Sequence, residues 1–230
     1  MKCDLNKDKQ AYCLKHVNVF QRRILTWYST NGRNFSWREP FRSDYEKVVA
    51  ELLLQRTRAE VVATFYPTFL ERFNDWHVIA NCDVAEIEQH LHPLGLWKRR
   101  AASLKSLAMA MVARSGIFPS TRDEIETLPG VGQYIASAIL LLCYGQPNPL
   151  LDVNMARVLE RFFGPRRLAD IRYDPDLQTL AHALTNHKRS IEINWAILDF
   201  ASIVCKRYTP ACPGCPLQNK CKYFLSLSVE

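Results

Sequence analysis

The stretch LPGVGQYIASAI, residues 128–139, decides the fold prediction for this chain. A capping-box pattern, TRDE at 121–124, predicts the start of a short helix that ends at Pro129 and Gly130. A strongly apolar helix then follows over about 133–144. The glycines allow a tight turn and leave N–H groups at the start of the second helix facing outward, as in phosphate sites. These residues alone predict a helical hairpin, and they fit a plain helix connection as well as a phosphate site.

Helical periodicity continues on both sides of this hairpin. Apolar residues recur every three or four positions, and only 8 Gly stand against 12 Pro, which favours helices over short strands and tight turns. Further helices are expected over about 8–31, 44–54, 58–73, 84–91, 97–115, 154–163, 174–186 and 189–204, before a cysteine-rich tail. The predicted fold class is therefore all-α.

The composition excludes some classes of protein and favours others. A chain of 230 residues with 48% hydrophobic content can bury a sizeable core, which argues against disorder. Thirty Lys and Arg against 23 Asp and Glu leave a net charge of +7, which favours an acidic partner such as nucleic acid or an anionic surface. Basic clusters are also typical of solvated helix faces, and they become phosphate contacts only beside a DNA-binding motif. The clusters are Arg22-Arg23, Lys98-Arg99-Arg100, Arg166-Arg167 and Lys188-Arg189.

The N-terminus lacks the apolar region of a secretory signal, and no apolar run is long enough to cross a membrane. We therefore expect a soluble, intracellular protein without a membrane partner. In a reducing cytosol, eight cysteines do not form a disulfide framework, so regular spacing among them indicates a metal site.

Four cysteines have such spacing: Cys205, Cys212, Cys215 and Cys221. Structural zinc usually shows two paired Cys-x2-Cys knuckles, and here there is only one, so the spacing leaves zinc and iron-sulfur open. The other cysteines are scattered and are expected to be ordinary thiols: Cys3, Cys13, Cys82 and Cys143.

Residues 128–139 closely resemble the helix-hairpin-helix of DNA glycosylases related to endonuclease III. The segment PLLDVNMARV at 149–158 resembles the one that holds the essential aspartate in that family. NWAILDF at 194–200 and the cysteine spacing that follows are similar to the endonuclease III and adenine mismatch glycosylase branches. The chain looks closest to the branch that removes thymine or uracil from G:T and G:U mismatches.

This resemblance implies a fold of two lobes. A helical barrel lobe would span 34–157 and include the helix-hairpin-helix at about 121–144. A cluster lobe would combine 1–33 with 158–230 and include the cysteine-rich loop 205–221.

The resemblance also implies cofactors and a partner. The four spaced cysteines would hold a 4Fe-4S cluster, and carbonyls of Leu128 and Val131 would hold a monovalent cation, K+ or Na+. Main-chain N–H groups around Gly130 and Gly132 would grip the backbone of double-stranded DNA that contains a mismatched or damaged base. The family further implies a monomer in a bacterial or archaeal cytoplasm.

Breaking an N-glycosidic bond builds positive charge on the sugar, so a fixed carboxylate near that sugar is an economical catalyst. Asp152 is the candidate, with Asn154 beside the hydrolytic water, and a helix N-cap is the alternative role of this aspartate. Tyr134 occupies the position where bifunctional relatives have the lysine that forms a Schiff base. A phenol cannot form an imine, which favours hydrolysis without strand cleavage, although simple packing is an alternative role.

NFSWR at 34–38 and ELLLQRT at 51–57 resemble segments of the thymine and adenine mismatch enzymes. Glu51 would face the flipped base, because a carboxylate on an apolar helix face is expensive to bury without a role; a solvated helix charge is the alternative. By the same resemblance, five further residues would contact DNA. Gln55 or Arg56 would fill the space left by the flipped nucleotide, and Leu96 would wedge the opposite stack. Trp37 and Arg38 would line the site.

The leading interpretation is a monofunctional DNA N-glycosylase of base excision repair, acting on thymine or uracil opposite guanine. Adenine removal opposite 8-oxoguanine is the alternative, because Glu51 also suits protonation of a purine. That branch usually carries a further C-terminal domain, and nothing follows Glu230 here. A bifunctional pyrimidine lyase ranks third. A non-catalytic DNA-lesion binder with the same fold stays open, although the presence of both Glu51 and Asp152 speaks against it.

Overall fold

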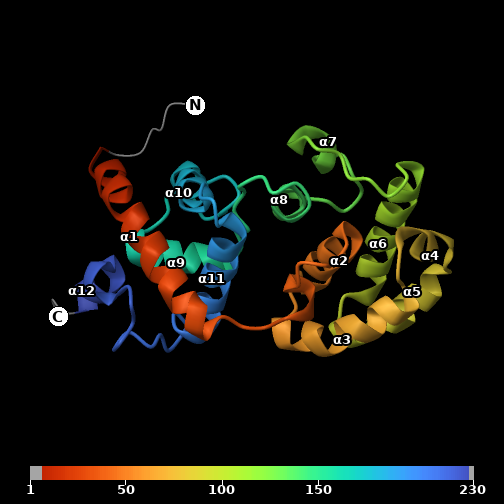
Figure 1. Ribbon diagram of the computed structural model, residues 1–230, viewed down its shortest axis with the longest axis horizontal. Coiled ribbons are helices and arrows are strands. Elements are labelled where there is room, and N and C mark those ends of the chain that lie inside the picture. The colour runs from red at the N-terminus through yellow and green to blue at the C-terminus, as the bar shows by residue number, and fades with distance from the viewer. Residues whose placement is uncertain (1–6, 228–230) are drawn as a thin grey trace. The chain divides into compact units, whose positions relative to one another are not determined.

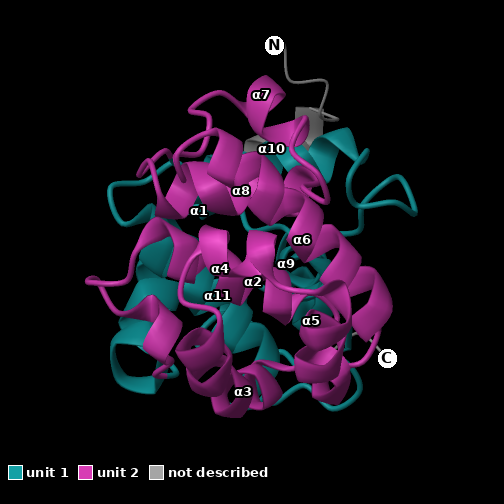
Figure 2. Ribbon diagram, turned by 90° about the vertical axis from the view of Figure 1, so that its right-hand side faces the viewer, with its two compact units in different colours: residues 1–33, 147–230 teal, residues 34–146 magenta. Residues whose placement is uncertain are grey.

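The computed structural model describes the backbone of residues 7–227 and the side chains from Lys15 to Leu227. In this range every regular element is helical, which confirms the all-α prediction (Figure 1). Contacts divide the chain into two compact units, shown in Figure 2: unit 1 contains residues 1–33 and 147–230, and unit 2 contains residues 34–146. No helix among the described residues is both long and apolar enough to span a bilayer.

The described part of unit 1 packs five α-helices and one 3-10 turn around an aromatic core. The elements are α1 (Lys7–Asn31), α9 (Val153–Phe163), α10 (Pro175–Thr185), α11 (Ser190–Ile203), η3 (Gln218–Lys220) and α12 (Lys222–Leu227). The ring of Phe20 on α1 lies 5.1 Å from that of Phe162 and 5.5 Å from that of Phe163, both on α9. Phe20, Phe162, Phe163 and Phe200 are all fully buried or nearly so, so they bind α1, α9 and α11 into one body.

The boundary between the units lies at residue 146, whereas the sequence analysis expected it after 157. The buried Asn194 of α11 explains the difference. Its Oδ1 accepts the N–H of Leu150 at 2.7 Å, and its Nδ2 donates to the carbonyl of Asn148 at 3.1 Å. Because Met155 and the rest of the buried face of α9 also enter the core of unit 1, residues 147–157 belong with that unit.

Unit 2 contains seven α-helices and two 3-10 turns. They are η1 (Ser36–Arg38), α2 (Asp44–Leu54), α3 (Ala59–Arg72), α4 (Trp76–Asn81), α5 (Val84–Leu91), η2 (His92–Leu94), α6 (Trp97–Ala113), α7 (Arg122–Glu126) and α8 (Gln133–Leu142). Val48 of α2, Ile79 of α4, Leu107 of α6 and Ile139 of α8 are buried in one continuous core. This core sets α2 beside α8, which positions the candidate site.

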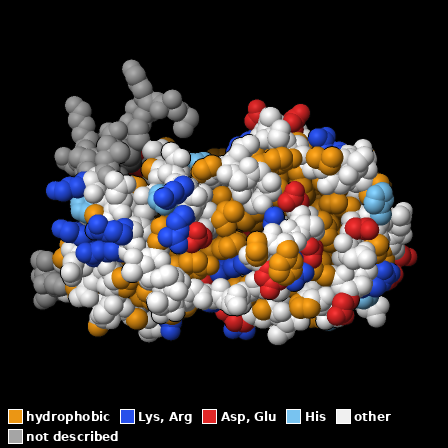
Figure 3. Space-filling view, in the orientation of Figure 1, with side chains coloured by type: hydrophobic (Ala, Val, Ile, Leu, Met, Phe, Trp, Pro, Cys, Tyr) orange, Lys and Arg blue, Asp and Glu red, His pale blue; other side chains and the backbone are white. Residues whose placement is uncertain are grey.

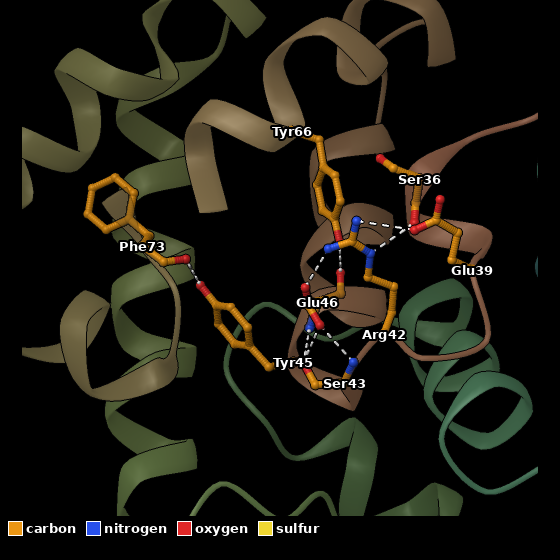
Figure 4. Close-up of polar contacts among 8 residues, drawn as sticks. All are labelled: Ser36, Glu39, Arg42, Ser43, Tyr45, Glu46, Tyr66 and Phe73. Atoms are coloured by element: carbon orange, nitrogen blue, oxygen red, sulfur yellow. Dashed lines mark hydrogen bonds and ion pairs between the residues drawn. The ribbon is translucent and has the colours of Figure 1, made fainter. Parts of the chain in front are cut away.

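A polar network fixes the first turn of α2 (Figure 4). Ser43 forms a complete capping box with Glu46, whose carboxylate accepts the N–H of Ser43 at 2.7 Å. Arg42 donates to Glu46 at 2.7 Å and to the carbonyl of Ser36 at 3.0 Å, and the hydroxyl of Tyr66 donates to the carbonyl of Glu46 at 3.0 Å. Desolvation by burial raises the pKa of Tyr66, so its hydroxyl stays a neutral donor. The network ties α2 to η1 and α3.

The expected helices are all present, with ends that differ by a few residues. Two short helices, α4 and α12, were not predicted, because six residues are too few to show a periodic pattern. The apolar helix after the hairpin ends at Leu142 instead of 144. At the predicted capping box, the Thr121 hydroxyl accepts the N–H of Glu124 at 3.4 Å and donates to the carboxylate of Glu124 at 2.9 Å.

Candidate functional site

The hairpin between α7 and α8 presents an open helix start. Gly130 has a φ of +73°, and a Cβ there would lie 3.2 Å from the Cβ of Ser103, so this position favours glycine on two grounds. Gly132 is the N-cap of α8 with extended backbone, and a Cβ added there would meet nothing within 4 Å. Leu128 and Val131 are buried beneath the turn, and the N–H of Val131 donates to the carbonyl of Leu128 at 3.1 Å. The space in front of α8 is therefore open, and no side chain caps its start.

Glu51 and Tyr134 meet inside unit 2. The Tyr134 hydroxyl of α8 donates to Oε2 of Glu51 on α2 at 2.8 Å. Glu51 is only 4% exposed, which excludes a solvated helix charge in this structure. Because a buried carboxylate needs a hydrogen-bonded partner, the two side chains form one polar pair within the apolar packing of α2 and α8.

Three residues of unit 2 other than glycine have left-handed backbone: Arg56, Leu96 and Ser115. Ser115 follows the end of α6, and the other two lie in turns that the sequence predicted to meet DNA. Gln55 is the C-cap of α2, and Arg56 after it has a φ of +57°. Leu96 is the N-cap of α6, has a φ of +52° and is 54% exposed. Such conformations are uncommon outside glycine and cluster at functional sites, which fits the sequence predictions for both turns.

Trp37 and Arg38 are placed differently from each other. Trp37 is 5% exposed and stacks on Phe35 with ring centroids 4.4 Å apart, so it packs in the core of unit 2 and offers almost no surface to DNA. Arg38 is partly exposed, and its guanidinium lies 5.0 Å from the ring centroid of Phe35. The structure therefore gives Trp37 a packing role where the sequence predicted a contact with DNA.

Asp152 in unit 1 is the N-cap of α9. Its carboxylate accepts the N–H groups of Asn154 at 2.9 Å and Met155 at 2.8 Å, and its Oδ2 accepts from Nδ2 of Asn154 at 2.6 Å. Desolvation by burial raises the pKa of Asp152, while these hydrogen bonds oppose that rise. The N-cap role is thus present, and it holds the carboxylate in one orientation.

A chain of hydrogen bonds connects Asp152 with the cysteine-rich loop. Asn154, which donates to Asp152, accepts from Nη1 of Arg157 at 3.1 Å. Arg157 also donates to the carbonyls of Cys205 and Ala201, each at 3.0 Å. The role of Arg157 was not predicted from the sequence, although its spacing of three residues from Asn154 on a helix is a signal for such a contact.

The four spaced cysteines line one apolar pocket in unit 1, together with Val158, Phe200, Val204 and Leu217. Arg161 borders the pocket, donates to Sγ of Cys205 at 3.4 Å and accepts from Sγ of Cys221 at 3.3 Å through its carbonyl. Desolvation by burial raises the pKa of Cys215 to about 11 and also raises that of Cys212. Among the described side chains, from Lys15 to Leu227, no three of His, Cys, Asp or Glu form a group that would hold a single metal ion.

The remaining cysteines stand apart from this pocket. Cys82 is buried and Cys143 is partly buried, both as free thiols in unit 2. Cys3 and Cys13 lie outside the described side chains.

Basic side chains gather on the face of unit 1 that Figure 3 shows. Of the clusters noted in the sequence, Arg166 pairs with Glu160, and Arg167 pairs with Asp176 at 2.8 Å, so this cluster stabilises unit 1. Lys206 is exposed beside the cysteine pocket, and Nη1 of Arg161 donates to the carbonyl of Lys206 at 2.7 Å. The exposed cations of the cysteine-rich loop are thus available to an acidic partner.

Comparison with known proteins agrees with this arrangement. A family model described as HhH-GPD superfamily base excision DNA repair protein matches residues 49–180. The chain is 38% identical over 205 residues to a thymine/uracil-DNA glycosylase of Pyrobaculum aerophilum, covering 87% of this chain and 89% of that protein. It is 34% identical over 213 residues to a thymine-DNA glycosylase of Aeropyrum pernix, covering 90% of this chain and 95% of that protein.

Among solved structures, that of a thermostable thymine-DNA glycosylase superposes with a TM-score of 0.85 at 31% identity, covering 92% of this chain and 98% of that one. The helical hairpin and the aspartate at the start of α9 lie within residues 49–180, which the family model matches. The chain belongs to the HhH-GPD superfamily of base excision DNA repair proteins.

Proposed function

We propose that this chain is a monofunctional DNA N-glycosylase that removes thymine or uracil mispaired with guanine. The observation that carries the proposal is the hydrogen bond of 2.8 Å between Tyr134 and the buried Glu51. By the resemblance, bifunctional relatives of the family have an amine at the position of Tyr134, so a phenol there supports hydrolysis without strand cleavage. The relatives described above are named thymine/uracil-DNA and thymine-DNA glycosylases, which supports the target base.

In this proposal, Asp152 stabilises the positive charge that develops on the sugar as the base leaves. Its three hydrogen-bond donors, two from the backbone of α9 and one from Asn154, fix the carboxylate before the reaction begins. A preorganised charge in a partly desolvated position stabilises a transition state more than a mobile charge in water does. Asn154 is also suited to orient the attacking water.

Glu51 and Tyr134 act on the base in the same proposal. Glu51 is buried and hydrogen-bonded, so it is suited to contact the flipped base and to share a proton with it as it leaves. Tyr134 holds Glu51 but offers no amine, so no imine forms and the abasic strand stays intact.

DNA would be held by the hairpin and by the two exposed turns. The N–H groups at the start of α8, next to Gly130 and Gly132, would receive a backbone phosphate. A carbonyl oxygen has two lone pairs, so Leu128 can accept from Val131 and still ligate K+ or Na+. Gln55 and Arg56 would replace the flipped nucleotide, and Leu96 would wedge the stack.

Cys205, Cys212, Cys215 and Cys221 would hold a 4Fe-4S cluster, and the pocket they line fits one. Zinc takes its thiolates about 2.3 Å from one ion, which requires the sulfurs to converge. A four-iron cluster takes each thiolate on a separate iron, which suits four thiols arranged around an apolar pocket. The cluster would stabilise the loop to which Arg157 and Arg161 are hydrogen-bonded.

Labelled duplexes with G:T, G:U and adenine opposite 8-oxoguanine test the proposal. The expected result is strand cleavage at thymine and uracil after alkali, and none without it. Cleavage only at adenine would establish the alternative target, and cleavage without alkali would establish a lyase. Binding without any excision would make the chain a lesion binder.

A further inference from the structure

Arg100 of α6 reaches across unit 2 to the end of α2. Its Nη1 donates to the carbonyls of Leu52 at 3.3 Å and Leu53 at 3.2 Å. Its Nη2 donates to the carbonyl of Gln55 and to the hydroxyl of Thr57, the latter at 2.7 Å. The last carbonyls of a helix have no donor within the helix, so this guanidinium serves as the C-terminal cap of α2.

In the described part of the chain, only these oxygens accept hydrogen bonds from the Arg100 guanidinium. Among the described residues it forms no ion pair with a carboxylate, and desolvation by burial lowers its pKa. A partly buried cation without a counter-ion is stable only when several oxygen dipoles are aimed at it. The arrangement therefore depends on the 52–57 segment keeping this one conformation.

Leu96 lies one helical turn before Arg100. The backbone N–H of Arg100 donates to the carbonyl of Leu96 at 3.0 Å, which is the regular bond that opens α6, so α6 itself joins Leu96 to the residue that carries the guanidinium. Arg56, between two residues that the guanidinium contacts, has a φ of +57°, and Leu96 has a φ of +52°. Strained backbone persists only where its surroundings fix it, and the Arg100 side chain is bonded to the residues on either side of Arg56.

We infer that Arg100 is a positioning residue that sets the spacing between the 55–57 turn and Leu96. The inference rests on the proposed function, in which these two segments enter the DNA stack around the flipped nucleotide. Arg100 need not touch DNA for this role. Lysine presents a single ammonium, which cannot reach four separate acceptors as a planar guanidinium does, so it substitutes only in part.

The test uses Arg100→Met, Arg100→Lys and, as a matched control, Arg114→Met, whose side chain is exposed at the C-terminal end of the same helix. The substrate is a G:T duplex with 2-aminopurine next to the thymine, whose fluorescence rises when the neighbour leaves the stack. Single-turnover excision and fluorescence are measured at saturating protein, below the melting temperature of every variant.

A misplacement of about 1 Å costs on the order of a hundredfold in rate, so Arg100→Met should excise between about tenfold and a hundredfold more slowly. Its fluorescence rise should shrink in parallel, while binding to matched duplex, dominated by phosphate contacts, changes by less than about threefold. Arg100→Lys should lie between Arg100→Met and wild type, and Arg114→Met should equal wild type.

An excision rate of Arg100→Met within about twofold of wild type would overturn the inference, because RT ln 2 is close to the noise of such comparisons. Slower excision with an unchanged fluorescence rise would overturn it too, since Arg100 would then act on the chemistry. If Arg100→Met is insoluble, Thr57→Val replaces it, because this variant removes one acceptor of the guanidinium and keeps the charge of Arg100. A normal fluorescence rise in both Thr57→Val and Arg100→Lys would then refute the positioning role of Arg100. A wild type that flips thymine without excising it refutes the proposed function alone, and the fluorescence comparison still decides on Arg100.

Discussion

Asp152→Asn separates the structural role of this residue from its chemical role. The asparagine carbonyl oxygen can still accept the N–H groups of Asn154 and Met155, now 2.9 and 2.8 Å from Oδ1. Its amide nitrogen, however, would replace Oδ2 and face the Nδ2 donor of Asn154 at 2.6 Å. Asn154 cannot turn its amide without losing the bond of 3.1 Å that its oxygen accepts from Arg157. One hydrogen bond is therefore lost, which should lower the free energy of unfolding by about 1 to 3 kcal/mol.

The chemical loss should be much larger. Asparagine keeps an N-cap but carries no charge, and losing one preorganised electrostatic group costs on the order of a hundredfold to a thousandfold in rate. Single-turnover excision on G:T and G:U duplexes should fall by at least about a hundredfold, while affinity for matched duplex is retained. Because burial raises the pKa of Asp152, wild-type activity should fall with decreasing pH at a value above the ordinary aspartate range of about 3.9. This acid limb should be absent from any residual activity of the variant.

Asp174→Asn is the matched control. Asp174 is also a buried N-cap in unit 1, and it accepts from the backbone N–H groups of Arg167, Leu168 and Leu177 at 2.5, 2.6 and 2.8 Å. Its substitution should reduce stability at least as much as that of Asp152 and leave excision by the folded protein unchanged. Excision by Asp152→Asn within a few-fold of wild type would refute the reasoning, as would an equal loss of excision in the control.

Three further predictions follow from the sites described. Tyr134→Lys should give a covalent adduct with DNA under borohydride. The yield should increase with pH, because the nearby Glu51 carboxylate favours the charged ammonium and only the neutral amine forms the imine, whereas efficient trapping by the wild type would exclude a monofunctional enzyme. Cys212→Ser should lose iron and visible colour while Cys143→Ser keeps both, and metal analysis that finds zinc without iron would exclude the cluster. Gly130→Ala should destabilise the protein by about 1 kcal/mol or more, because the backbone of Gly130 has a φ of +73°. Gly132→Ala should keep the fold and weaken DNA binding, because the added Cβ lies in the open space at the start of α8, and normal DNA binding by this variant would show that the hairpin does not contact DNA.

The features that sequence predicted correctly are local ones. The hairpin glycines, the N-cap at Asp152 and most helix bounds follow from short patterns that do not need tertiary contacts. The four cysteines line one pocket because they are close in sequence. The expectation for Glu51 as a buried group also rested on a local signal, a carboxylate on an apolar helix face.

The features that sequence did not reveal depend on contacts between distant segments. Arg100 was grouped with a basic cluster, yet its partners are carbonyls more than forty positions away. Trp37 lies in a motif similar to those of DNA enzymes, but its burial is decided by Phe35 and by packing on α3. The expected lobe boundary lies within α9, because the sequence does not show that Asn194 forms hydrogen bonds with the backbone of Asn148 and Leu150, more than forty positions away.

The most direct measurement of the central proposal is the free base released by the wild-type protein from a G:T duplex, identified by chromatography under single-turnover conditions. The proposal predicts free thymine in an amount equal to the abasic sites, with the strand uncut until alkali is added. Tight binding to the mismatch without release of thymine or uracil would contradict it.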